Sequence, residues 1–164
     1  MELLQLYDEN INRVDESVDR AIKNTIPSNR FFMVIIVFIQ NEEGKFLVQK
    51  TSPERDSVFA FTGGHVNYGD DYYETVFKEA KEELGLDLNP DKLKYVAMKP
   101  YQKAFCALYH YKDNIDINNL VLQKEEVENV YWLSKAEIED LIDNDLLRTS
   151  NIELFRMVCE YLDK

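Results

Sequence analysis

The sequence predicts a mixed α and β fold, with a mainly β core and helices around it. A continuous apolar, β-branched and aromatic run at 31–40 (FFMVIIVFIQ) is typical of a central strand buried on both faces. Apolar residues recur at helical spacing over 70–84, and two further helix-start patterns close the chain. Because no linker or repeat divides the 164 residues, we expect one domain over 1–164.

Residues 1–30 remain open from pattern alone. Val14, Val18 and Ile22 have helical spacing, yet the stretch YDEN at 7–10 looks like a turn between strands. In either case we expect this segment to pack on the domain as an N-terminal extension.

Strands dominate the next part of the chain. The runs at 31–40 and 45–50 flank a glycine-containing loop, which predicts a β-hairpin. A third strand is expected at 58–62, ending at Gly63-Gly64. Further strands are expected at 93–99, 104–111 and 129–133.

Helices are predicted at three places. The first covers about 70–84, where Gly85 ends it. The other two open with the capping-box patterns Ser134-x-x-Glu137 and Ser150-x-x-Glu153. With these helices, we expect a β-sheet that is flanked by helices.

Composition restricts the partners. The chain carries 31 acidic against 19 basic residues, a net charge of −12, which disfavours binding to nucleic acids and to anionic membranes. A small phosphorylated substrate with a metal counterion remains compatible. No leader pattern is seen, and the longest apolar run, 31–39, is too short to span a bilayer. Two distant cysteines, Cys106 and Cys159, read as buried thiols and predict a reducing, cytoplasmic location.

The candidate chemistry is concentrated in one window of 23 residues. It holds four of the five glycines, Gly63, Gly64, Gly69 and Gly85. It also holds Glu79, Glu82 and Glu83, which at helical spacing share one face. Such carboxylates repel one another unless a cation is present, and hard cations such as Mg²⁺ prefer oxygen ligands. A solvated acidic face is the alternative for the glutamates alone. The Gly-Gly turn beside them favours a phosphate- or metal-binding loop.

This window resembles the Nudix box, G, five residues, E, seven residues, then R-E-U-x-E-E-x-G-U with U aliphatic. Here the match runs from Gly64 through Asp70 to the nine residues KEAKEELGL at 78–86. Two positions depart conservatively, Asp70 for glutamate and Lys78 for arginine. More widely, the chain is similar to the branch of isopentenyl-diphosphate isomerase-like proteins in four stretches, at 7–10, 31–51, 61–64 and 122–134.

The resemblance implies a Nudix-type α/β/α sandwich with a mixed sheet and a metal-binding helix. It implies hydrolysis of a phosphoanhydride bond in a nucleoside diphosphate-linked or related substrate, with Mg²⁺ or Mn²⁺ as cofactor. Glu79, Glu82 and Glu83 match the metal-binding glutamates, with the carbonyl of Gly64 completing the shell. The partner would be a small phosphorylated metabolite, and the oligomeric state, a homodimer included, stays open.

Other residues receive roles by the same resemblance. A glutamate from a later loop often acts as base or extra ligand, and Glu125 and Glu126 are the candidates, unless both are surface charges. Lys78 keeps the charge of the box arginine that helps to hold the glutamates but loses its planar geometry. Asp70 would serve either the box or the helix N-terminus.

The remaining predictions concern substrate binding, for which Gly63, Gly64, His65 and Arg55 are the candidates. For His65, a hydrogen-bonding role is favoured over metal ligation, because a lone histidine is a weak ligand signal. His110, alternating with tyrosines on a strand, is expected to be structural.

Three alternatives stay open. An isomerase would need a cysteine where Gly63 stands, and we expect no nearby thiol to replace it, because Cys106 lies on another expected strand; isomerase chemistry is therefore disfavoured. The Asp70 and Lys78 changes could instead leave a silent metabolite-binding module. The acidic surface could also serve a protein partner.

Overall fold

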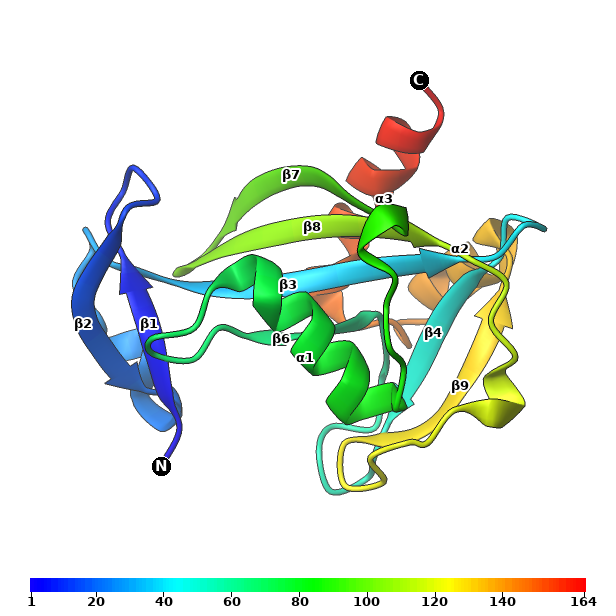
Figure 1. Ribbon diagram of the computed structural model, residues 1–164, viewed down its shortest axis with the longest axis horizontal. Coiled ribbons are helices and arrows are strands. Elements are labelled where there is room, and N and C mark those ends of the chain that lie inside the picture. Colours follow the sequence, from blue (N-terminus) through cyan, green and yellow to red (C-terminus); the bar gives the residue numbers. More distant parts are fainter.

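The structure is a computed structural model that describes residues 1–164. Nine strands form one mixed sheet, and helices cover both of its faces (Figure 1). The strands are β1 (Leu3–Tyr7), β2 (Arg13–Asp19), β3 (Phe31–Gln40), β4 (Phe46–Thr51), β5 (Phe59–Ala60), β6 (Thr62–His65), β7 (Leu93–Tyr101), β8 (Ala104–Lys112) and β9 (Val127–Leu133). The helices are α1 (Tyr72–Leu84), α2 (Lys135–Asp143) and α3 (Thr149–Leu162), with short 3₁₀ turns η1 (Arg20–Thr25), η2 (Pro90–Lys92) and η3 (Ile117–Asn119).

Strand β3 organises the sheet, as its apolar run predicts. One edge pairs in parallel with β8 from Phe32 to Gln40, and the other edge pairs in turn with β1, β6 and β4. Its side chains alternate between two apolar clusters. Met33, Ile35, Val37 and Ile39 pack with α1 on one face, and Phe32, Ile36 and Phe38 pack with α3 on the other.

The expected hairpin and third strand are only partly right. β3 and β4 pair only at Gln40 and Phe46, because β4 then runs alongside β9. The strand expected at 58–62 is split into β5 and β6, and β6 continues through the two glycines. A Cβ at Gly63 would stand 2.3 Å from the carbonyl oxygen of Ile35, so this close pairing of β6 with β3 requires glycine.

The first 30 residues form a hairpin and a 3₁₀ turn. The turn interpretation of 7–10 is correct, because the Asp8 carboxylate accepts from the backbone N–H of Asn10 and Asn12, both at 2.9 Å. β1 then joins the sheet by pairing with the start of β3. The helical spacing of Val14, Val18 and Ile22 does not correspond to an α-helix. Val14 and Val18 lie in β2, and Ile22 lies in the short 3₁₀ segment Arg20–Thr25 that follows it.

Helix ends follow their caps except at α3. Asp71, not Asp70, caps α1, and Gly85 ends it at φ 64°. The capping box at Ser134 is confirmed. The one at Ser150 is wrong, because α3 begins at Thr149 after Arg148, without a side-chain cap.

The two cysteines are buried and free, as expected. None of the helices combines the length and the hydropathy that a membrane span requires.

Candidate active site

Helix α1 passes close to β6, so Glu79 lies against the backbone of Gly64. A Cβ at Gly64 would stand 2.4 Å from the Glu79 carboxyl carbon, and only glycine leaves room for this carboxylate. Burial, followed by the charges of Glu83 and Glu82, raises the pKa of Glu79 to about 8. The charge of Lys78 offsets this shift only in part, so the ionised form of Glu79 is disfavoured in the absence of a cation.

Glu83 lies one helical turn further on and is 4% exposed. It accepts a hydrogen bond from Gln49 Nε2 at 3.4 Å, and Gln49 also donates to Thr62 Oγ1 at 2.8 Å. Burial raises the pKa of Glu83 to about 7, although Arg55, 3.7 Å away, opposes this shift. Glu79, which is half-buried, and Glu83, which is buried, thus lie side by side on one helix.

Arg55 joins Glu83 to the later loop. Its Nη1 atom lies 3.1 Å from Glu126 Oε2. Two backbone hydrogen bonds hold this loop in place. The Gln123 N–H donates to the Glu83 carbonyl oxygen at 3.0 Å, and the Ser52 N–H donates to the Glu126 carbonyl oxygen at 3.0 Å.

Of the two later glutamates, only Glu126 reaches this cluster. The side chain of Glu125 is exposed and forms no hydrogen bond or ion pair, while its carbonyl accepts from Ser52 Oγ at 2.6 Å. Sequence could not separate the two because both are acidic.

The donor set fits a hard divalent cation, although the carboxylates do not converge on one point. No three acidic, histidine or cysteine side chains stand close enough together to hold a metal ion in this arrangement. Glu82 is exposed, and Glu83 is paired with Arg55. The fit rests on the oxygen chemistry of Glu79 and Glu83, their raised pKa values, and the bare backbone of Gly64.

The two departures from the box form a pair. Lys78 Nζ donates to Asp70 Oδ2 at 3.3 Å, and both side chains are about 40% exposed. Lys78 makes no hydrogen bond to the glutamates. The pair therefore links the start of α1 to its second turn at the surface.

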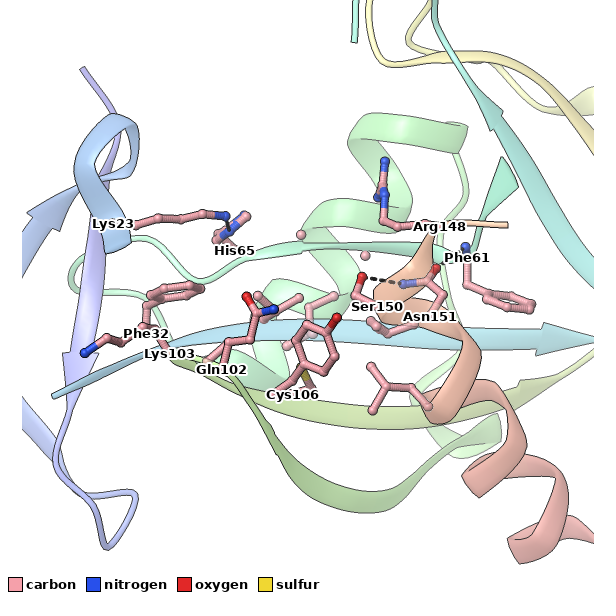
Figure 2. Close-up of a pocket in the computed structure, with 18 of the residues that line it drawn as sticks. Lys23, Phe32, Phe61, His65, Gln102, Lys103, Cys106, Arg148, Ser150 and Asn151 are labelled. Atoms are coloured by element: carbon pink, nitrogen blue, oxygen red, sulfur yellow. Dashed lines mark hydrogen bonds between the residues drawn. The ribbon is translucent and has the colours of Figure 1, made fainter. Parts of the chain in front are cut away.

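A cavity of about 450 Å³ opens beside Glu83, on the α3 side of the sheet. Gly63, Gly64 and Glu83 line one part of it, and Figure 2 shows other lining residues, with His65 and Lys23 at one end. Five basic side chains also line it, Arg20, Lys23, Arg55, Lys103 and Arg148, against two carboxylates, Asp56 and Glu83. In a chain of net charge −12 this cavity is a basic exception, suited to an anionic ligand.

Of these basic residues, sequence pointed only to Arg55. The other four come from η1, the β7–β8 turn and the residue before α3, and no local spacing connects such distant segments.

His65 also lines the cavity, where its Nε2 lies 3.0 Å from Lys23 Nζ. Burial and the surrounding cations, Lys23 first, lower the pKa of His65 to about 3. The predicted hydrogen bond is thus made to Lys23, and a substrate contact stays a prediction. His110 instead bonds Gln40 Oε1 at 2.8 Å, as a structural histidine does.

The expectation that no thiol lies near Gly63 is wrong. Cys106 lines the same cavity, because β8 pairs in parallel with β3 and places Cys106 opposite Val34, whose other neighbour is His65. Burial raises the pKa of Cys106 to about 11, so it is a neutral thiol.

Comparison with known proteins identifies the family. The NUDIX domain model matches residues 30–155. The chain belongs to the Nudix family. The matched segment contains every predicted site residue and leaves β1, β2 and η1 outside.

Relatives and solved structures agree. An uncharacterized Nudix hydrolase of Clostridium acetobutylicum is 23% identical, over 88% of this chain and 76% of its own. A Deinococcus radiodurans crystal structure superposes with a TM-score of 0.77 at 22% identity, over 94% of this chain and 98% of that one. The NUDIX domain of Shewanella oneidensis NrtR, solved with ADP-ribose, gives a TM-score of 0.65 at 12% identity, over 88% and 94% of the chains. The predicted Nudix fold is confirmed, and the isomerase-like branch stays a hypothesis.

Proposed function

We propose that this Nudix protein hydrolyses a phosphoanhydride bond in a small nucleoside diphosphate-linked or related diphosphate, with Mg²⁺ or Mn²⁺. One observation carries the proposal. Two carboxylates with raised pKa values, the half-buried Glu79 and the buried Glu83, lie against glycine backbone at a basic cavity. The carboxylates suit the cation, and the cavity suits the phosphates.

Each residue then has a role. Glu79, Glu83 and the Gly64 carbonyl would hold the cation, with Glu82 at the exposed side. When bound, the cation polarises phosphoryl oxygens and lowers the pKa of the attacking water. Glu126 orients or deprotonates that water. Arg55, on leaving Glu83, would contact a phosphate of the substrate, as its planar guanidinium favours.

The substrate class has support from a structural neighbour. The Shewanella oneidensis domain was solved with ADP-ribose, a nucleoside diphosphate joined to a sugar. A cavity of about 450 Å³ falls within the usual size range for small-molecule sites.

Two alternatives keep a specific basis. A silent binding module would retain the cavity while Lys78, paired with Asp70, fails to support the glutamates. An isomerase would use the neutral thiol of Cys106, which the fold brings into the cavity.

The test is turnover of a panel: nucleoside di- and triphosphates, nucleotide sugars, dinucleoside polyphosphates and isopentenyl diphosphate, with Mg²⁺ or Mn²⁺. We expect phosphate or nucleotide release that requires metal and is abolished in Glu83→Gln. Glu126→Gln should lose about 100-fold or more in kcat, as expected on removing a general base. The matched variant Glu125→Gln should keep wild-type rates.

Other outcomes point elsewhere. Metal binding without turnover would favour the silent module. Isomerised rather than hydrolysed isopentenyl diphosphate, lost in Cys106→Ala, would favour the isomerase. Equal rates in Glu126→Gln and Glu125→Gln would remove Glu126 from the mechanism.

A further inference from the structure

Two lysines in the cavity have no acidic partner. Each lining arginine is paired: Arg20 with Glu2, Arg55 with Glu83 and Glu126, and Arg148 with Asp56. Lys23 and Lys103 form no ion pair, although acidic residues outnumber basic ones by 31 to 19. Lys103 Nζ donates to the Ile26 carbonyl at 3.0 Å, so Lys23 is the amine that has neither an ion pair nor a backbone acceptor.

Lys23 is held in place by those neighbours. Its Nζ lies 3.0 Å from His65 Nε2 and 5.2 Å from the centre of the Phe32 ring. Figure 2 shows Lys23 and His65 pointing toward each other at one end of the cavity, with Arg148 and Asn151 toward the other. A half-buried ammonium without a counter-ion is unfavourable, and a bound anion would relieve this.

The wall that carries Lys23 is fixed to the sheet. Asp19 caps η1 by accepting from Ala21 N–H, and Arg20 N–H donates to the Glu2 carbonyl at 2.9 Å. The Lys103–Ile26 bond ties the end of η1 to the β7–β8 turn. The wall is therefore positioned before any ligand binds.

This end of the cavity is separate from the glutamates. His65 points into the cavity, whereas Gly64, the residue before it on β6, faces Glu79 on α1, because successive residues of a strand face opposite sides of a sheet. Gly63, the glycine beside Glu83, lies two residues from His65, about 7 Å along the strand. Phosphorus atoms that share one bridging oxygen lie closer together than that. Lys23 also lies outside residues 30–155, which the family shares.

We propose that Lys23, beside the positive charges of Arg20 and Lys103, binds a second phosphate group of the ligand, separate from the phosphoanhydride at the glutamates. The substrate is then a diphosphate phosphorylated again on its distal moiety. That last statement rests on the proposed function, whereas the anion site does not.

The first test is titration with inorganic phosphate in EDTA, followed by amide chemical shifts of the full chain. Phosphate should shift the amides of Lys23 and His65, with acetate as the carboxylate comparison. Lys23→Met, which keeps the chain's bulk, should weaken phosphate binding about tenfold or more, as loss of a charge-assisted bond predicts. Lys23→Arg should retain binding. Lys94→Met, which removes an exposed, unpaired lysine of β7, should leave it unchanged.

The second test compares ligands that differ by one phosphate: coenzyme A with its 3′-dephospho form, and ADP-ribose with its 2′-phosphate. The phosphorylated member of at least one pair should bind more tightly to wild type, and Lys23→Met should remove the difference. Unchanged phosphate binding in Lys23→Met, or no difference within either pair, would overturn the proposal. Lys23-dependent binding without any turnover would contradict the hydrolase alone.

Discussion

Glu79 illustrates how a single residue trades stability for chemistry. The pKa of its carboxyl is about 8 in the fold, against 4.5 for the free group. The folded protein therefore binds this proton more tightly than the unfolded chain does. Without metal, the free energy of unfolding should fall as the pH rises from about 4.5 to about 8.

Replacing Glu79 removes this penalty. In EDTA at pH 8 we expect Glu79→Gln to raise the free energy of unfolding by about 2 kcal/mol, while metal-dependent hydrolysis is lost. Urea unfolding at pH 5 and pH 8 measures the effect, which should be smaller at pH 5. Glu82→Gln, at an exposed site, should change stability by less than about 0.5 kcal/mol. A Glu79→Gln variant less stable than wild type at pH 8 would contradict this account.

At the residue scale, sequence located the acidic half of the site but little of the basic half. The spacing of Glu79 and Glu83 and the two glycines are local features, and helical geometry places them together. Lys23, Lys103 and Arg148 come from segments far apart in the chain. Only the tertiary pairing brings them to one cavity.

At the scale of elements, β6 contains two adjacent glycines that have different roles. A Cβ at Gly63 would meet the Ile35 carbonyl, which is backbone and cannot move aside, whereas one at Gly64 would meet the flexible end of Glu79. We expect Gly63→Ala to cost about 3 kcal/mol or more of stability. Gly64→Ala should cost less than about 1 kcal/mol yet reduce activity by displacing Glu79. Thermal unfolding and turnover distinguish the two, and equal losses of stability would refute the distinction.

Helix caps allow a second matched comparison. Ser134→Ala should lower stability by about 1 kcal/mol, because the Ser134 side chain accepts from Glu137 N–H at 3.1 Å. Ser150→Ala should stay within about 0.5 kcal/mol of wild type, because Ser150 lies inside α3 and caps nothing. Chemical denaturation measures both, and a larger loss in Ser150→Ala would count against the cap assignment.

Most elements could be predicted from sequence, and their pairing could not. The buried run of β3, the amphipathic α1 and the cap of α2 depend on local patterns. The parallel pairing of β3 with β8, 72 residues apart at Val34 and Cys106, leaves no local signal, so sequence alone does not predict that Cys106 lies at the site. The identical capping patterns at Ser134 and Ser150 diverge because the strand bridge of Phe59 with Leu147 sets where α3 begins.

At the scale of the whole molecule, β3 belongs to both apolar clusters. Its alternate side chains enter the α1 cluster and the α3 cluster, so neither helix packs independently of the other. We expect a single cooperative unfolding transition, with Trp132 fluorescence and far-ultraviolet circular dichroism superimposing. Phe155→Ala should lower the free energy of unfolding by about 3–5 kcal/mol and should shift the midpoints of both signals together. Separated transitions would contradict one domain over 1–164.

The charge of the molecule is also unevenly distributed. The chain has a net charge of −12, yet the charged side chains that line the cavity are mainly cations. Electrostatics therefore favour small anions that enter the cavity over extended polyanions that would cover the surface.

We propose that this fold hydrolyses a phosphoanhydride with a metal held by Glu79 and Glu83. The most direct test of this proposal is ³¹P NMR of ADP-ribose and the other panel diphosphates in ¹⁸O-labelled water. The wild-type protein with Mg²⁺ should give phosphate products carrying ¹⁸O, with none in EDTA and none from Glu79→Gln. Turnover that persists in EDTA, or that Glu79→Gln leaves unchanged, would contradict the account.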